Sequence, residues 1–236
     1  MARAGLTQAE RKNIAHLVDH YKNNQDRFSQ FLEQLRGLFL GEEPLTKHVH
    51  SIKWRIKDPE HLRRKLTQKL KESRKPNRTF AITKENLFHK INDLVGVRIL
   101  HLHTKQMEEI DRAIKALFSD HRYHILRGPI AKTWDDESRD YFASIGIKTE
   151  KSPSMYTSVH YEVRESSRRK YTFELQIRTL MEEVWGEVSH TLNYPEPTRS
   201  LACREQIQVL ARATSTCTRL VDSIFKTHDE DSNRED

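Results

Sequence analysis

Residues 171–194 read YTFELQIRTLMEEVWGEVSHTLNY, and two different periods meet in this stretch. Residues 171–178 alternate between apolar and polar side chains, which is typical of a strand with one buried face. From Thr179 onward the apolar residues recur at helical spacing, which predicts a helix with an apolar stripe of Met181, Val184, Trp185, Val188 and Leu192. The polar positions hold Glu174, Gln176, Arg178, Glu183, Glu187 and His190. These side chains suit a phosphate and metal site, and a solvated edge strand explains the same pattern equally well.

The composition limits the classes of protein that fit the chain. Its 236 residues are enough for one large domain or two small ones. A net charge of +7 favours an anionic partner, either nucleic acid or nucleotide phosphates, over a generally basic surface. No apolar run reaches membrane-spanning length and the first residues lack an apolar signal segment, so we expect a cytoplasmic protein without a membrane partner. Two cysteines are too few for a disulfide framework and fit a reducing compartment.

Positive charge concentrates in residues 47–78. Residues 48–57 alternate like a strand, and Asp58 followed by Pro59 is typical of the start of a helix. Guanidinium and ammonium donors from such a strand and helix can share phosphate oxygens, which favours Arg55, Lys57 and Lys65 as a polyphosphate cradle. A solvated basic helix face is the alternative.

Two further strands carry candidate ligands. Residues 91–99 predict a strand entered through Asp93, a natural Mg²⁺ ligand, with Gly96 allowing close approach to the backbone. Residues 156–163 alternate with Tyr156 and His160 on one face, where they could stack on a base and bind a phosphate. A packed aromatic ring and a satisfied histidine would produce the same pattern.

The other segments are expected to be mostly helical. Thr7 and Glu10 have capping-box spacing ahead of one or two helices that end near Gly41. Thr83 is expected to cap a short helix, and residues 107–118 to form an amphipathic one. Residues 121–155 are expected to be a long loop. The domain organisation we predict is N-terminal helices over 1–44, a catalytic domain over 45–197, a C-terminal helix over 198–227 that could mediate oligomerisation, and a disordered tail over 228–236.

Two carboxylates among several cations are what metal-assisted phosphoryl transfer requires. The sequence has no Walker A loop, no GxGxxG and no nucleophile elbow, which argues against the commonest nucleotide-binding folds and serine hydrolases. Glu187 and His190 have metal-ligand spacing, but the second such pair of a di-iron bundle is missing. A dedicated transition-metal site is therefore disfavoured.

Five motifs in order resemble the RelA/SpoT-type alarmone synthetase domain over about residues 45–195. They are Arg55-x-Lys57 with Lys65, Asp93-Leu-Val-Gly96-Val-Arg98, Tyr156-x-Ser158-x-His160, Glu174-Leu-Gln176-Ile-Arg178-Thr179, and Trp185 with His190. Nothing resembles the hydrolase domain of the long bifunctional members. The chain therefore resembles a stand-alone small alarmone synthetase.

This resemblance implies an α+β fold, with a mixed β-sheet flanked by helices and related to nucleotidyltransferases. It also implies transfer of the β,γ-pyrophosphate of ATP to the 3′-hydroxyl of GDP or GTP, which makes (p)ppGpp. In the implied site, Asp93 and Glu174 are catalytic and bind Mg²⁺, and Glu174 also activates the acceptor hydroxyl. The implied ATP-binding residues are Arg55 and Arg98, on the two sides of the adenine, and Lys57 and Lys65 on the phosphates. The implied acceptor-binding residues are Tyr156, His160, Gln176 and Arg178.

The resemblance has one departure, directly before Tyr156. Family members usually have Lys-x-Asn-Gly there, whereas residues 152–155 read SPSM. The donor side is therefore better defined than the acceptor side, and the acceptor could instead be an adenosine nucleotide, giving (p)ppApp, or the 3′ end of tRNA. The toxic small synthetases use such an acceptor, and an antitoxin partner would then be expected. An inactive nucleotide- or RNA-binding module is a further alternative, against which the intact Asp93 and Glu174 argue.

Overall fold

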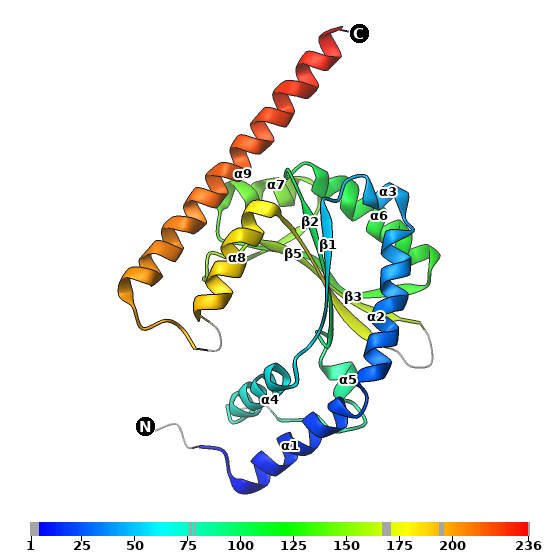
Figure 1. The fold of residues 1–236 in the computed structure, drawn as a ribbon, viewed down its shortest axis with the longest axis vertical. Coiled ribbons are helices and arrows are strands. Elements are labelled where there is room, and N and C mark those ends of the chain that lie inside the picture. The colour runs from blue at the N-terminus through cyan, green and yellow to red at the C-terminus, as the bar shows by residue number, and fades with distance from the viewer. Residues whose placement is uncertain (1–4, 76, 78, 167–170, 194–195, 236) are drawn as a thin grey trace.

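The computed structural model describes residues 5–75, 77, 79–166, 171–193 and 196–235. Six strands form one mixed sheet in the order β1-β2-β6-β5-β3-β4, with parallel pairs β2/β6 and β3/β4. Helices flank this sheet, which confirms the predicted α+β architecture (Figure 1). The elements are α1 (Gln8–Lys22), α2 (Gln25–Leu40), α3 (Glu43–Thr46), β1 (Ser51–Ile56), α4 (Pro59–Ser73), α5 (Leu87–Lys90), β2 (Val95–His101), α6 (Gln106–Asp120), β3 (Tyr123–Thr133), α7 (Asp136–Ser144), β4 (Lys148–Lys151), β5 (Ser158–Glu165), β6 (Thr172–Thr179), α8 (Leu180–Asn193) and α9 (Leu201–Glu235).

The two faces of the sheet have different roles. Figure 1 shows α2 and α6 on one side of it and α8 and α9 on the other. The apolar side chains of β6 point toward α2 and α6, where the Phe173 ring centroid lies 6.1 Å from Phe31, 6.3 Å from Phe39 and 5.9 Å from Phe118. These aromatic rings form much of the core. The polar side chains of β6 are thereby left facing α8.

The predicted helix starts are observed at the first and fourth helices. Thr7 and Glu10 form the expected capping box at α1. The Asp58 carboxylate accepts hydrogen bonds from the backbone N–H groups of Glu60 and His61 at the start of α4. Such a cap satisfies backbone donors that have no partner within the helix. It also sets the direction in which α4 leaves β1.

The prediction of a long loop over residues 121–155 is wrong. The segment forms β3, α7 and β4, and Asp135 caps α7 by accepting from the Ser138 N–H. The alternation of β3 is hidden because its register with β5 shifts between Ile125 and Ile130. Strand β4 has only four residues, all polar. The helix expected after Thr83 instead starts later, at Leu87.

Helices α8 and α9 also differ from the expectation. Val184, Val188 and Leu192 of the predicted apolar stripe are 49%, 37% and 42% exposed, whereas Glu183 is 5% exposed. Helix α8 is therefore turned so that a carboxylate faces the sheet. Helix α9 continues to Glu235, so residues 228–235 are helical in the structure, where a disordered tail over residues 228–236 is expected from the sequence.

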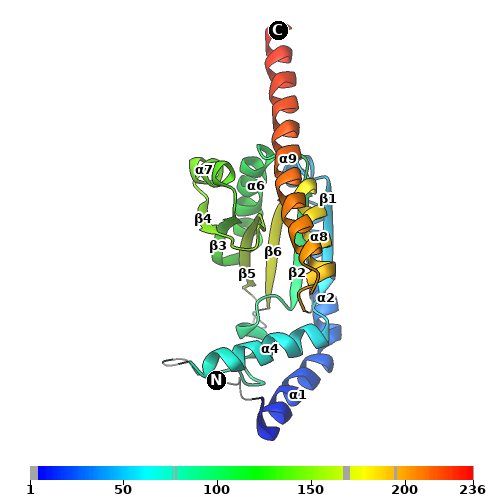
Figure 2. The same cartoon turned by 90° about the vertical axis from the view of Figure 1, so that its left-hand side faces the viewer.

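Helix α9 is anchored along much of its length, since the Asp222 carboxylate accepts from the Thr104 N–H at 2.6 Å and the Phe225 ring stacks on His103. The Trp185 indole N–H donates to the Ile207 carbonyl across the α8–α9 contact at 3.0 Å. The end of α9 projects away from the rest of the chain (Figures 1 and 2). In the described part of the chain, no helix has both the length and the apolar character needed to cross a bilayer.

Candidate active site

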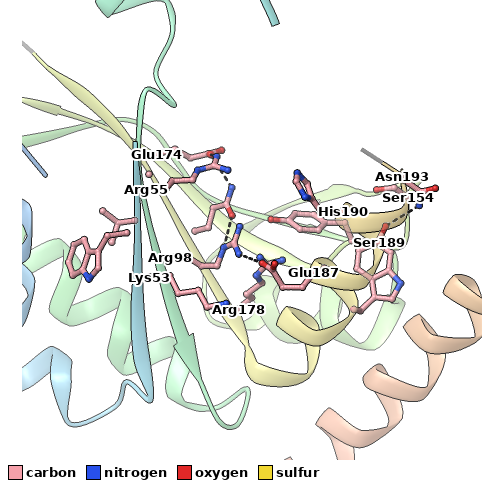
Figure 3. A pocket seen from close by; sticks show the side chains of 17 residues that line it. Lys53, Arg55, Arg98, Ser154, Glu174, Arg178, Glu187, Ser189, His190 and Asn193 are labelled. Atoms are coloured by element: carbon pink, nitrogen blue, oxygen red, sulfur yellow. Dashed lines mark hydrogen bonds and ion pairs between the residues drawn. The ribbon is translucent and has the colours of Figure 1, made fainter. Parts of the chain in front are cut away.

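A cavity of about 650 Å³ lies between the polar face of the sheet and α8. Figure 3 shows Arg55, Arg98 and Glu174 projecting from the strands, with Ser189 and His190 contributed by α8. Six of the ten site residues predicted from the sequence line this cavity: Arg55, Arg98, Tyr156, Glu174, Gln176 and Arg178. The remaining four do not line it: Lys57 and Lys65 pair with Asp93, which interacts electrostatically with Glu174, and His160 contacts Glu174 directly.

Asp93 lies just before β2 and is paired with two lysines. Its Oδ2 is 2.8 Å from Lys57 Nζ and 2.7 Å from Lys65 Nζ. Burial alone would raise the pKa of Asp93, but Lys65 and Lys57 outweigh burial and lower it below the usual value. Asp93 is therefore ionised at neutral pH. Its Oδ1 is buried and has no hydrogen-bond partner among the described residues.

Glu174 lies in the middle of β6 and is the second carboxylate of the site. His160 Nδ1 lies 3.2 Å from Oε1, and Gln176 Nε2 donates to Oε2 at 3.0 Å. An Arg55 guanidinium nitrogen lies 3.7 Å from Oε2. Burial opposes ionisation of Glu174, but the hydrogen bond from His160 helps to bring its pKa below the usual value. Glu174 is thus a second anion at neutral pH.

The two predicted adenine-binding arginines come from neighbouring antiparallel strands. Arg55 of β1 lies opposite Gly96 of β2, and a Cβ atom at Gly96 would be 2.8 Å from Arg55 Nε. The close approach at Gly96 is thus made by the Arg55 side chain. Arg98 Nη1 donates to Glu183 at 3.0 Å and to Glu187 at 2.8 Å, which brings α8 against the sheet.

Tyr156 has aromatic and cationic neighbours. Arg178 Cζ lies 5.7 Å from its ring centroid, and the rings of His160 and Trp185 lie at 5.7 Å and 6.4 Å. Burial raises the pKa of the Tyr156 hydroxyl, so it stays protonated. Arg178 shares a strand face with Glu174, as predicted, but its guanidinium pairs with Glu183 at 2.6 Å.

The unusual run before Tyr156 takes a particular backbone conformation. Met155 has φ of 60°, in the left-handed region that favours glycine. Its side chain packs with Trp185, Ile207 and Ala211 at the contact between α8 and α9. The loop that carries Tyr156 is therefore attached to the C-terminal helix through Met155.

Sequence reasoning missed two contributors to the site. Lys53 lines the cavity and donates to Glu183 at 2.6 Å. Glu162 lies opposite Glu174 in the β5–β6 register and accepts from Asn92 Nδ2 at 2.6 Å. The available signal was alternation, because Lys53 shares a face with Arg55 and Glu162 shares one with His160.

Comparisons with known proteins identify the same region. The family model described as "Region found in RelA / SpoT proteins" matches residues 54–199, more than half of the chain. A comparison with curated proteins finds no match. At 17–18% sequence identity, the likeness to the solved structures below concerns the fold.

Three solved structures illustrate that likeness. A GTP pyrophosphokinase family protein from Streptococcus pneumoniae has a TM-score of 0.64 and 17% identity, and the match covers 89% of this chain and 95% of that one. Small alarmone synthetase 1 from Bacillus subtilis has a TM-score of 0.61 and 18% identity, covering 90% and 99% of the two chains. The same synthetase bound to its product pppGpp has a TM-score of 0.61 and 17% identity, covering 89% and 99%.

Proposed function

The chain belongs to the RelA/SpoT family, and on that premise we propose that it is an ATP-dependent pyrophosphokinase that converts GDP or GTP into (p)ppGpp. The observation that carries the proposal is a pair of ionised carboxylates, Asp93 and Glu174, beside a cation-lined cavity of about 650 Å³. That volume is within the usual range for small-molecule sites. Phosphate transfer depends on positioning and on offsetting charge, and this arrangement supplies both.

The donor side is proposed to lie along β1 and β2. Arg55 and Arg98 come from adjacent strands, which supports their placement on the two sides of the adenine. Lys57 and Lys65 both pair with the same oxygen of Asp93, which brings their ammonium groups together and supports their role on the ATP phosphates. Ammonium groups are compact charges that can move from a carboxylate to a phosphate oxygen.

The carboxylates fit Mg²⁺. This ion takes one or two protein carboxylates and completes its shell with phosphates and water. Asp93 is ionised and has a buried oxygen without a partner among the described residues, and Glu174 is ionised as well. We propose that these two residues hold Mg²⁺, which when bound offsets charge on the ATP phosphates.

In the proposed reaction, the acceptor 3′-oxygen forms a bond to the β-phosphorus of ATP. The bond from that phosphorus to the α,β-bridging oxygen breaks, and AMP leaves with the bridging oxygen. The acceptor proton passes to the ionised Glu174 carboxylate, whose Oε1 contacts His160. The β- and γ-phosphates are thereby transferred together.

GDP or GTP is the proposed acceptor, stacked on Tyr156. The second candidate is an adenosine nucleotide or the 3′ end of tRNA, and the observation that favours it is Met155. This residue stands where members of the family usually have glycine, and it carries a side chain that packs on α9. An enzyme of this second kind would be toxic and would be expected to have an antitoxin.

The test follows the label from [γ-³²P]ATP in the presence of Mg²⁺ and, separately, GDP, GTP, ADP or deacylated tRNA. Label in guanosine tetra- or pentaphosphate is expected with the wild type and not with Glu174→Gln, which keeps the shape of the side chain without its charge. Label only in an adenosine product or in tRNA would mean that this molecule, and not GDP or GTP, is the acceptor, while the proposed pyrophosphate transfer stands. Transfer to none of them would refute the proposal and favour an inactive binding module.

A further inference from the structure

One buried carboxylate on α8 contacts three cations from three different strands. Glu183 accepts from Lys53 of β1 at 2.6 Å, from Arg98 of β2 at 3.0 and 3.2 Å, and from Arg178 at the end of β6 at 2.6 Å. Its side chain is only 7% exposed. Burial by itself would raise the pKa of Glu183, but Lys53, Arg178 and Arg98 lower it below the usual value. Glu183 is thus an anion held among cations.

Capping of the N-terminus of α8 does not explain why Glu183 contacts these cations. That helix end is closed by Thr179 and Glu182: the Thr179 N–H donates to Glu182 Oε2 at 2.8 Å, and the Glu182 N–H donates to Thr179 Oγ1 at 3.3 Å. The carboxylate next in sequence is therefore free of a capping role. Its contacts are with the cavity-lining cations.

Arg178 depends most on this partner. Its side chain is 3% exposed, and burying a guanidinium costs several kcal/mol unless a carboxylate compensates. Burial lowers the pKa of Arg178, and nearby Arg98 acts in the same direction, whereas Tyr156, Glu183 and Glu182 oppose them. Among the described residues, the ion pair that Arg178 makes is with Glu183. Its orientation beside Tyr156 is therefore set from α8.

Arg98 and Arg178 belong to different halves of the proposed site, since the first is on the ATP side and the second on the acceptor side. We propose that Glu183 is a positioning residue that orients both arginines together and thereby aligns the two nucleotide subsites. This inference rests on the proposed function. It adds Lys53, held by the same carboxylate at the cavity wall, as a further cation of the site.

A competing effect has the opposite sign. If Glu183 mainly neutralised the cations, removing its charge would raise the positive potential of the cavity and tighten the binding of anionic nucleotides. Positioning predicts weaker binding, because the guanidinium groups would lose the contacts that fix them. The direction of the change therefore separates the two effects.

Glu187 provides a matched control. It pairs with Arg98 at 2.8 Å, but its side chain is 55% exposed, and among the described residues it forms an ion pair with that arginine alone. Figure 3 shows Arg98 and Glu187 pointing toward one another. Substituting Glu187 thus tests the ATP side without changing the contact between Glu183 and Arg178.

The experiment measures two dissociation constants by calorimetry, one for α,β-methylene ATP with Mg²⁺ and one for GDP, on the full chain. For Glu183→Gln we expect both constants to rise about tenfold or more, as for loss of hydrogen bonds to charged groups. Glu183→Asp, which keeps the charge, should recover part of each loss. Glu187→Gln should change the ATP-analogue constant only.

Several outcomes would overturn the inference: tighter binding by Glu183→Gln, unchanged constants, or a change confined to one ligand. If Glu183→Gln does not fold, Glu183→Asp is measured instead. Weaker binding of both ligands by Glu183→Asp then supports the inference, and unchanged binding overturns it. These readings need no turnover, so a wild type that binds both ligands and transfers nothing refutes the proposed function alone. A wild type that binds neither refutes both.

Discussion

Asp93→Asn removes one charge from a largely buried ion-paired cluster on the donor side. The Asp93 and Lys57 side chains are 15% and 11% exposed, and that of Lys65 is 34% exposed. Breaking a fully buried ion pair costs about 3–5 kcal/mol, and an exposed pair contributes below about 1 kcal/mol. Because this cluster is intermediate and asparagine keeps an acceptor oxygen, we expect a loss of about 2 kcal/mol.

A loss of that size is measurable. For a chain of this length it lowers the melting temperature by about 4–8 °C, which circular dichroism resolves. The folded pKa of Asp93 is below its unfolded value, so its contribution is present at neutral pH and is lost as the pH falls below 3.8 through the folded pKa. The difference in melting temperature between Asp93→Asn and the wild type should therefore become smaller in acid.

Glu60→Gln is the control, because Glu60 is 58% exposed and, within the described part of the chain, its ion pair is with Arg63 on the same helix. Such a pair is worth about 0.5 kcal/mol or less. Pyrophosphate transfer should be lost in Asp93→Asn and kept in Glu60→Gln. A variant Asp93→Asn that melts with the wild type, or transfers at its rate, would refute the reasoning about this cluster.

Three further predictions concern close contacts and a buried histidine. Gly96→Ala places a methyl group 2.8 Å from Arg55 Nε, so the KM for ATP should rise several-fold while that for the acceptor stays the same. Gly186→Ala would overlap the Arg178 guanidinium and should raise the KM for the acceptor instead; a shift in the ATP constant alone would contradict this. His101 is 3% exposed and burial lowers its pKa to about 4, below the unfolded 6.5. Stability should fall by about 3 kcal/mol as the pH drops from 6.5 toward 4, and denaturant titrations of His101→Gln should show a flatter profile.

The strands that carry the site could be predicted because their alternation is local. In β6, Phe173 packs in the core and Glu174 faces the cavity, as a period of two requires. Strand β3 could not be found in this way, because its pairing with β5 is non-local and its register shifts along its length. The polar edge strand β4 has no periodic signal at all.

Which residues belong to the site was easier to predict from the sequence than which side chains contact one another. Alternation indicates which side chains share a face, but contacts across strands depend on register, as for Arg55 above Gly96. The rotation of α8 was predicted wrongly because hydrophobicity alone places Val184 and Val188 inward. The cations on the sheet instead require a carboxylate there, and Glu183 takes the buried position.

The two halves of the proposed site are supported by different kinds of structure, and this has an evolutionary consequence. On the ATP side, Arg55 and Arg98 lie on β1 and β2, where the hydrogen-bond ladder between the two strands fixes their positions. On the acceptor side, His160, Gln176 and Arg178 also lie on paired strands, but Tyr156 is carried by the short segment before β5, outside the strand pairing. Substitutions and insertions there leave the pairing of the strands intact. A lineage with this architecture can therefore diversify the molecule it modifies while its energy donor stays the same.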